Sequence, residues 1–254
     1  MPLNLPPTVN NGTTAPEARE VDPESEPDFK PDYLYEDRQT ILDELRSGKR
    51  IFGVPAASLS WGIDGDRMKA SLTPGIEGEK QTAAILAELA EQVPEMFVFH
   101  SLSWPESNGD TDHIVVYGNT VIVIDSKRWK STRKYSITAK GEIMRGTVHF
   151  TEGKVKIGYA LKSWRKKLPP ELKVMGVVSL AQEKVFVARD KNWFKAPYRL
   201  VEAEKLSAHL LSTFKKNPIK DPVKGSTLVY LAKLLVKPRD RRAEIINLDG
   251  ARRF

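Results

Sequence analysis

Charged residues stand at both ends of one apolar segment, and their types and spacing could support phosphate chemistry. Asp112 precedes the run HIVVY, and Asp125-Ser126-Lys127 directly follows the run TVIVI. Both runs are β-branched and typical of strands, and Gly118-Asn119 between them suits a two-residue hairpin turn. If Tyr117 faces Thr120 across that turn, the register places Asp112 opposite Asp125 on one face of the hairpin.

Such a pair of opposed carboxylates is unfavourable unless something compensates it. Cross-strand neighbours lie about 5 Å apart, where two negative charges repel by about 3 kcal/mol at an effective dielectric near 20. A divalent cation or a shared proton would relieve that repulsion. The alternative is a frayed hairpin end whose charges are simply solvated. The same register places Asp110 opposite Lys127, where it either holds the lysine or acts only as a turn residue.

A third carboxylate, Glu79, favours the functional interpretation. The segment from Thr73 to about residue 93 predicts a helix, with Thr73 as its N-cap and Pro74 in the first helical position. Glu79 falls on the apolar stripe of this helix, where an unpaired carboxylate is costly. The alternative is that Glu79 reaches solvent or favours the helix dipole near the helix start. The stripe is Ile76, Ala83, Leu86, Ala90 and Val93.

The donor set indicates which cofactor to expect. Carboxylate oxygens favour a hard ion, Mg²⁺ or Mn²⁺, and the chain has no cysteine that would favour zinc. Its four histidines show no paired metal-ligand spacing, and we interpret His113 as a packing or hydrogen-bonding residue. GIEGEKQT is not a phosphate-binding loop, because Glu79 replaces the glycine required before the lysine.

These residues in this order resemble the nuclease-related domain, NERD. The similarity rests on Gly75-x-x-Gly78-Glu79, on Asp110-x-Asp112-His113 before an apolar strand, and on Asp125-x-Lys127. It covers roughly residues 74–187 and, more loosely, the helix after them. NERD in turn resembles the PD-(D/E)XK, restriction-endonuclease-like superfamily. Two departures are that the family more often has Glu at position 125 and that no Pro precedes Asp112.

The resemblance implies a metal-dependent nuclease. Asp112 and Asp125 would hold the metal ion, helped by the Ser126 carbonyl, and Glu79 would complete the site directly or through water. The ion would polarise the phosphate and lower the pKa of a bound water. Lys127 would stabilise the attacking hydroxide or the developing charge, and Asp110 would be auxiliary.

Composition divides the chain into three parts. Residues 1–50 hold 11 acidic and 6 basic side chains, a net charge of −5, whereas the whole chain is +7. We expect an acidic, Pro-rich tail with a short helix in 1–45, a NERD-like domain in 46–215 and a basic extension with one helix in 216–254. The absence of cysteine fits a reducing cytoplasm, and no run is long enough to span a bilayer.

Two basic clusters with aromatic neighbours predict contacts to nucleic acid. The first adjoins the proposed site, and there we favour binding to a phosphate backbone. The second surrounds Trp164 on a predicted helix, and for it we slightly favour a solvated helix face with Trp164 in the core. The basic residues are Arg128, Lys130, Arg133 and Lys134 in the first cluster, and Lys162, Arg165 and Lys166 in the second.

The expected fold is a mixed α/β domain, a restriction-endonuclease-like core in which helices flank a central mixed sheet. Strands are predicted at KVMGVVSL and KVFVA, and helices within 200–214 and at 227–237. The leading functional hypothesis is hydrolysis of phosphodiester bonds, in DNA rather than RNA. The alternatives are a catalytically inactive nuclease fold that binds nucleic acid or protein, and a scaffold with a structural cation site.

Overall fold

The predicted hairpin lies at the centre of the fold. The computed structural model describes residues 32–61, 66–104, 109–129, 134–151, 156–182, 184–189 and 193–238. Strands β3 (Asp110–Tyr117) and β4 (Thr120–Lys127) pair antiparallel, with Tyr117 opposite Thr120 and His113 opposite Ile124. Gly118 adopts φ +54°, as a tight turn of this kind requires. The register predicted from the sequence is therefore confirmed.

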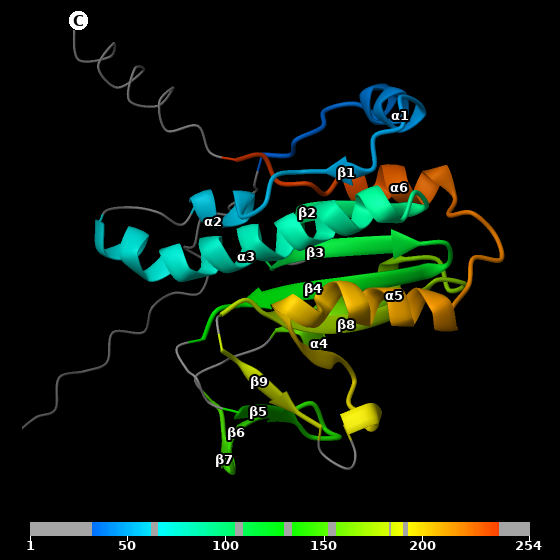
Figure 1. The fold of residues 1–254 in the computed structure, drawn as a ribbon. Helices are drawn as coiled ribbons and strands as arrows, with labels where there is room; N and C mark the ends of the chain where they lie inside the picture. Colours follow the sequence, from blue (N-terminus) through cyan, green and yellow to red (C-terminus); the bar gives the residue numbers. More distant parts are fainter. Residues whose placement is uncertain are drawn as a thin grey trace, which may run out of the picture.

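A six-stranded mixed sheet extends from this hairpin in the order β1-β2-β3-β4-β8-β10 (Figure 1). Strand β2 (Met96–Ser103) pairs antiparallel with β3, and β1 (Ile51–Phe52) pairs parallel with β2. On the other side, β8 (Lys173–Leu180) runs parallel to β4, and β10 (Arg199–Glu202) runs parallel to β8. The inner strands are almost continuously apolar because helices cover both faces.

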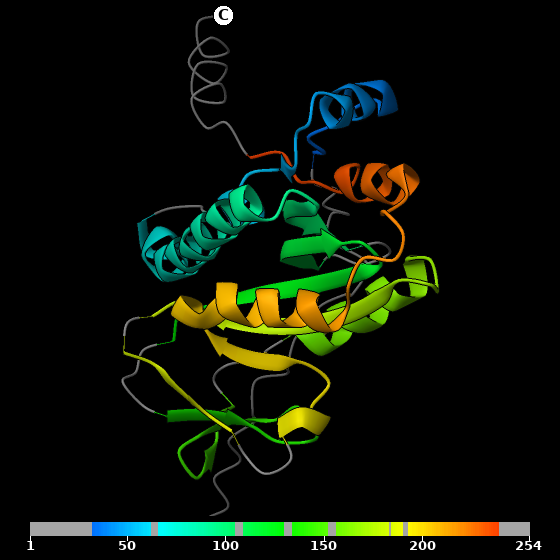
Figure 2. The ribbon, with the colours of Figure 1, turned by 45° about the vertical axis from the view of Figure 1, so that its right-hand side comes forward.

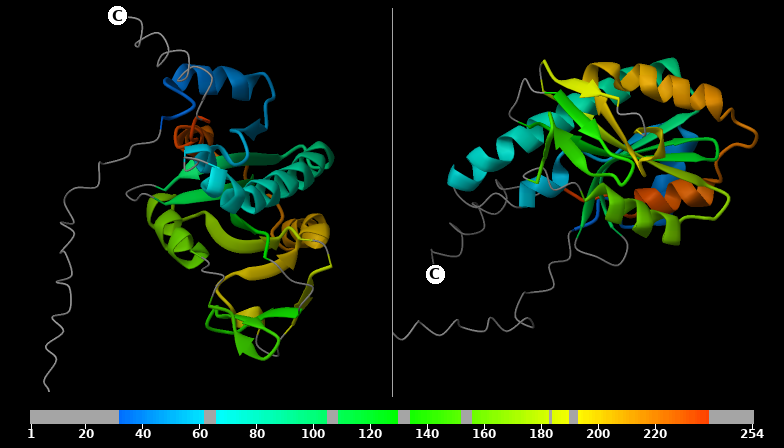
Figure 3. Two further views of the ribbon diagram at one scale, coloured as in Figure 1. Left: turned by 90° about the vertical axis from the view of Figure 1, so that its left-hand side faces the viewer. Right: turned by 90° about the horizontal axis from the view of Figure 1, so that it is seen from below.

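Helices cover both faces of this sheet (Figures 1 and 3), and an apolar cluster lies under each layer of helices. Helices α3 (Asp66–Gln92) and α5 (Leu206–Lys216) cover one face, where Leu86 and Phe214 join Val115 and Ile122. Helices α4 (Ile157–Lys167) and α6 (Gly225–Ala232) cover the other, with Trp164 in its core, and α1 (Arg38–Arg46) packs against α6. A short helix, α2 (Ala57–Trp61), lies beside β2.

A second, smaller sheet lies beneath the first (Figure 2). Its order is β7-β6-β5-β9, from strands β5 (Lys134–Ile137), β6 (Ile143–Arg145), β7 (Val148–His149) and β9 (Phe186–Ala188). Two 3₁₀ turns, η1 (Trp193–Lys195) and η2 (Ala203–Lys205), flank β10. Of this sheet only β9 was predicted as a strand.

Two predicted helix boundaries are wrong. Helix α3 begins at Asp66, so Thr73 is not its N-cap and Pro74 lies inside the helix. Proline removes one hydrogen bond of a helix interior, but tertiary packing can override such a local preference. Helix α6 ends at Ala232, well before residue 237. The chain beyond it extends along β2, where the Leu234 carbonyl accepts the Ser103 N–H and the Val236 N–H donates to the Ser101 carbonyl.

The ends of the chain lie outside the described residues, and so does the acidic tail predicted for residues 1–31. Helix α1 accounts for the short helix predicted within 1–45, with Asp37 as its N-cap. In the described parts of the chain, no helix is long and apolar enough to cross a membrane.

Candidate functional site

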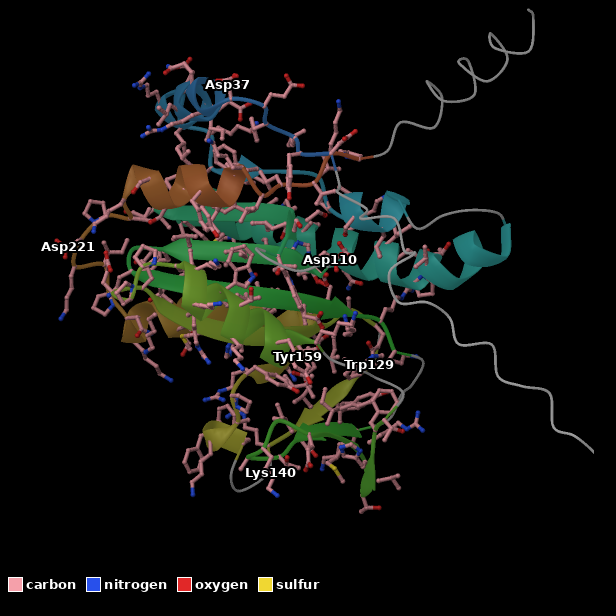
Figure 4. The ribbon with its side chains drawn as sticks, turned by 180° about the vertical axis from the view of Figure 1, so that it is seen from behind. Asp37, Asp110, Trp129, Lys140, Tyr159 and Asp221 are labelled. Carbon is pink, nitrogen blue, oxygen red and sulfur yellow. The ribbon has the colours of Figure 1, made fainter. Side chains whose placement is uncertain are left out.

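Three aspartates meet where β3 begins and β4 ends. Asp110, Asp112 and Asp125 line one small pocket of about 10 Å³, together with Lys156 and Ala160. That volume has room for about one water molecule. Asp110, labelled in Figure 4, is exposed at this end of β3. Asp112 is buried. The hairpin register brings these carboxylates together, because it sets the same face of both strands toward the pocket.

Asp125 and Lys127 form an ion pair along β4. Lys127 Nζ lies 2.9 Å from Asp125 Oδ1, so Asp125, not Asp110, holds the lysine. Burial would lower the pKa of Lys127, but Asp125 and Asp112 outweigh it and raise that pKa, so Lys127 stays a cation. Burial raises the pKa of Asp125 even though Lys127 opposes this. Asp125 Oδ2 is buried and has no hydrogen-bond partner, an uncommon condition for a carboxylate oxygen.

Asp112 is bound to the backbone of the opposite strand. Its Oδ2 accepts a hydrogen bond of 2.6 Å from the Ser126 N–H. Burial raises the pKa of Asp112 well above its ordinary value, and the nearby Glu79 and Asp125 carboxylates raise it further. Asp112 and Asp125, which the predicted register placed opposite one another, are therefore close enough to interact strongly.

Glu79 comes to this site from α3. Its side chain is 4% exposed, and its Oε2 accepts the Ala56 N–H at 3.0 Å. Burial, followed by the charge of Asp110, raises the pKa of Glu79 to about 8. Glu79 is thus on the buried side of α3, and because α3 begins at Asp66 the residue lies near the middle of the helix, not near its start. It does not line the pocket of the three aspartates, although it influences the pKa of Asp112.

The backbone that meets Glu79 is held in an unusual conformation. Ala56 and Ser101 have φ values of +62° and +54°, a region that costs residues other than glycine about 1–3 kcal/mol. Ser101 Oγ accepts the Ala57 N–H at 3.0 Å and donates to the Val54 carbonyl at 2.9 Å. These bonds fix the loop that presents the Ala56 N–H to Glu79. Sequence reasoning missed Ala56 and Ser101, since neither residue type marks a left-handed conformation.

Two buried histidines, one in β2 and one in β3, lie on the face of the sheet that α3 covers. His100 Nδ1 and His113 Nδ1 are 2.8 Å apart, and His113 Nε2 is 3.0 Å from Ser126 Oγ. Burial lowers the pKa of His100 to about 4, and burial and His100 lower that of His113, so both rings are neutral. The prediction of His113 as a hydrogen-bonding residue is confirmed. The pair braces Ser126, whose N–H binds Asp112.

Two tryptophans fix the start of β3. Trp104 Nε1 and Trp164 Nε1 donate to Thr111 Oγ1 at 2.9 and 3.0 Å. Thr111 lies between Asp110 and Asp112, so these bonds position both aspartates. Trp164 is fully buried, which confirms the preference for placing it in the core. The role of Thr111 was not predicted, because nothing in the sequence relates it to either indole.

The structure places the predicted basic residues in different settings. Arg128 forms an ion pair with Glu77 of α3, and Lys134 is exposed at the start of β5. Lys130 and Arg133 lie outside the described residues. Lys162, Arg165 and Lys166 are exposed on α4, where Arg165 donates to the Val174 carbonyl.

The aromatic residues of the first cluster pack against one another. The Trp129 ring lies 5.0 Å from Tyr135 and 4.9 Å from Phe150, centroid to centroid, and Tyr135 is fully buried. Trp129, labelled in Figure 4, follows β4 of the first sheet, and Tyr135 lies in β5 of the second, so these rings connect the two sheets. Tyr135 is therefore not available for stacking on bases, and Trp129 is half-buried against it, so the basic side chains are the main candidates for nucleic-acid contacts.

A family model for the nuclease-related domain, NERD, matches residues 74–225. The chain belongs to the NERD family. The match spans more than half of the chain and includes all four predicted catalytic residues. No curated protein and no solved structure matched. The NERD domain therefore runs from inside α3 to the start of α6, and the mixed sheet flanked by helices is consistent with a restriction-endonuclease-like core.

Proposed function

We propose that this NERD protein is a nuclease that hydrolyses phosphodiester bonds with Mg²⁺ or Mn²⁺, acting on DNA in preference to RNA. The observation that carries the proposal is the meeting of three aspartates in one pocket beside a lysine. Asp110, Asp112 and Asp125 line that pocket, and Lys127 is paired with Asp125. Asp112 is buried and Asp125 partly buried beside it, which is unfavourable without a cation, and membership of a nuclease-related family supports the same function.

The residues fit a hard divalent ion by their donor chemistry. Asp125 Oδ2 is a buried acceptor without a donor, and oxygen ligands are those that Mg²⁺ prefers. In the described part of the chain, no three Asp, Glu or His side chains already form a group that could hold a metal ion. Asp112, Asp125 and the Ser126 carbonyl would hold the ion, with Glu79 directly or through water. Once bound, the ion would polarise the phosphate and activate a water molecule.

The protein side chains would supply charge and position. Lys127 is held as a cation beside Asp125, so it would stabilise negative charge that develops on the phosphate rather than accept a proton. The Ser126 N–H holds Asp112 in place, and the Ala56 N–H holds Glu79. Fixed carboxylates of this kind reduce the reorganisation needed when substrate binds.

A second candidate is an inactive nuclease fold that only binds nucleic acid or a protein. The observation in its favour is that the carboxylates of Glu79, Asp112 and Asp125 are already engaged by protein donors. Such a module would keep the fold and the basic surface but would not cleave. The chain would then bind a nucleic-acid strand or a protein through electrostatic attraction and would not catalyse a reaction.

Cleavage assays decide between these two functions. Single- and double-stranded DNA and RNA are incubated with the full chain in Mg²⁺, Mn²⁺ or EDTA. We expect cleavage of DNA with either ion and none in EDTA. Asp125→Asn should be inactive, whereas the same change at exposed Asp221, far from the site in Figure 4, should leave activity intact. Binding without cleavage under every condition would reject the nuclease and favour the second candidate.

A further inference from the structure

A second concave site lies along the edge of the central sheet, separate from the acidic pocket. Two adjoining cavities of about 560 and 600 Å³ share Arg189, Trp193, Arg199, His209 and Ser212, and together we call them the edge groove. Strand β10 and helix α5 contribute one side, and β9 and η1 contribute the other (Figure 2). Each cavity is within the size range of small-molecule sites, about 300–1,000 Å³.

The edge groove carries an excess of positive charge. Glu202 is the acidic residue among the described residues that line it, and it is already engaged. Its Oε1 accepts the Val187 N–H at 2.9 Å and pairs with Lys205 Nζ at 3.0 Å. The remaining cations therefore have no carboxylate among the described lining residues to offset them. The basic lining residues are Lys173, Arg189, Arg199, Lys205, Lys216 and, when protonated, His209.

The arginines and Trp193 give the groove a defined arrangement. The guanidinium groups of Arg189 and Arg199 lie 4.9 and 5.1 Å from the Trp193 ring centroid. Arg199 also donates to the carbonyls of Phe194 and Ala196, both at 2.9 Å, so it shapes the wall of the groove. Arg189 is exposed, and so is Lys216 on α5. These two side chains are the cations best placed to receive a ligand.

The pKa of His209 is affected by the same group of positive charges. This residue lies in both cavities, on the groove side of α5. Burial lowers its pKa, and the charges of Arg199, Lys216 and Arg189 lower it further. Four basic side chains thus converge on one space, one directly after β9, one from β10 and two from α5. Crowding cations in this way is unfavourable in the empty groove and becomes favourable when an anion enters.

We propose that the edge groove binds phosphate groups carried by nucleotides, supplied by a strand of nucleic acid. Arginine and lysine are the side chains that recognise phosphate, and the groove offers both. A free mononucleotide carries the same chemistry and is the other source to be tested. The choice of a strand rests on the proposed function, whereas phosphate binding itself does not.

Sheet register places the groove close to the acidic site. Lys127 pairs with Leu180, and Leu180 pairs with Glu202, so the three residues form one row across β4, β8 and β10. Two strand spacings separate Lys127 from Glu202, about 10 Å. This distance equals about three steps of 3.4 Å along one strand of a DNA duplex, and fewer steps along a more extended single strand. A strand held at the acidic site could therefore continue into the edge groove.

Binding in EDTA tests the groove without any cleavage. Affinity is measured by fluorescence anisotropy with a labelled single-stranded DNA 12-mer, and by titration with AMP, across a range of salt. The variants are Arg189→Ala, Lys216→Ala and both together. Lys215→Ala is the matched control, because it removes the same charge from the adjacent exposed position of α5, which does not line the groove. Thermal melts confirm that each variant is folded.

We expect the double variant to bind the 12-mer at least tenfold more weakly than the control. The salt dependence should also flatten by about 1.4, since each phosphate contact on a single strand contributes about 0.7. Loss of AMP binding with unchanged 12-mer binding would assign the groove to free nucleotides and overturn the strand as its source. If the double variant matches Lys215→Ala for both ligands, the proposal is wrong. If the double variant loses binding as expected but the unmodified protein never cleaves nucleic acid, the groove proposal stands and only the proposed nuclease activity is rejected.

Discussion

Glu79→Gln should stabilise the metal-free protein at pH 8 and change it little at pH 5. Burial and the charge of Asp110 raise the pKa of Glu79 from 4.5 to about 8. A carboxyl group whose pKa is higher in the folded state makes the fold less stable as pH rises, because the unfolded chain releases the proton first. The loss of stability caused by ionised Glu79 begins near pH 4.5 and is complete above pH 8. Glutamine cannot ionise and avoids it.

The size of the effect follows from the two pKa values. Each tenfold change in proton affinity is worth about 1.36 kcal/mol, so the full cost of ionised Glu79 is about 5 kcal/mol. Asp112 and Asp125 compete for the same proton, so one substitution recovers only part of this, about 2–4 kcal/mol. At about 2–4 °C per kcal/mol for a chain of this size, the melting temperature at pH 8 should rise by several degrees.

The assay is thermal and urea unfolding in EDTA between pH 5 and 8.5. Glutamine keeps an oxygen that can accept the Ala56 N–H, so the loop contact is preserved. Glu88→Gln is the control, since Glu88 is exposed on the same helix and should change neither the stability nor its dependence on pH. The reasoning is refuted if Glu79→Gln has the same slope of stability against pH as the unmodified protein.

Three further predictions concern the site and the basic surface. Asp125→Ala or Lys127→Ala should abolish cleavage in the presence of Mg²⁺ while circular dichroism still shows the fold; retained cleavage, with contaminating nucleases excluded, contradicts the site. Asp112→Asn should raise the melting temperature in EDTA at pH 8 by about 2 °C or more, because it relieves like-charge repulsion while its amide oxygen keeps the Ser126 N–H bond; a lower melting temperature contradicts this. Replacing Arg128, Lys130, Arg133 and Lys134 with alanine should weaken duplex binding across sequences and flatten its salt dependence by about 2–3, less than four full contacts because Arg128 is already paired with Glu77. Deleting residues 1–31 should tighten binding at low salt if the acidic tail competes for that surface; identical salt slopes for the unmodified chain and the fourfold variant would instead direct attention to Lys162, Arg165 and Lys166.

The hairpin could be predicted from the sequence because one local feature determined it. Gly118-Asn119 fixes the turn, the period of two fixes the face, and the apolar runs fix the strand type. The position of Glu79 followed in the same way from helical periodicity, which does not depend on where the helix begins. The predicted first helical residue, Pro74, is eight residues later than the observed one, Asp66, yet the predicted burial of Glu79 was correct.

Features that depend on distant partners could not be predicted. Strand β10 has only four residues and acquires its structure by pairing with β8, and the second sheet is assembled from strands of two to four residues. Segments this short carry little periodicity. The same holds for Thr111, whose hydroxyl meets two indoles from other parts of the chain, and for Ala56, whose neighbours Val54 and Ala57 are held by Ser101.

The lengths of the strands in the central sheet bear on how the protein avoids aggregation. The four inner strands have eight residues each, whereas the outermost strands, β1 and β10, have two and four. An edge strand exposes unpaired N–H and C=O groups that another chain can extend, and the risk grows with the length of the edge. Here the longest and most apolar strands are all enclosed by neighbours, and a second molecule would gain only a few backbone hydrogen bonds at either side. The sheet can thus keep a strongly β-branched centre without offering a long template for edge-to-edge association.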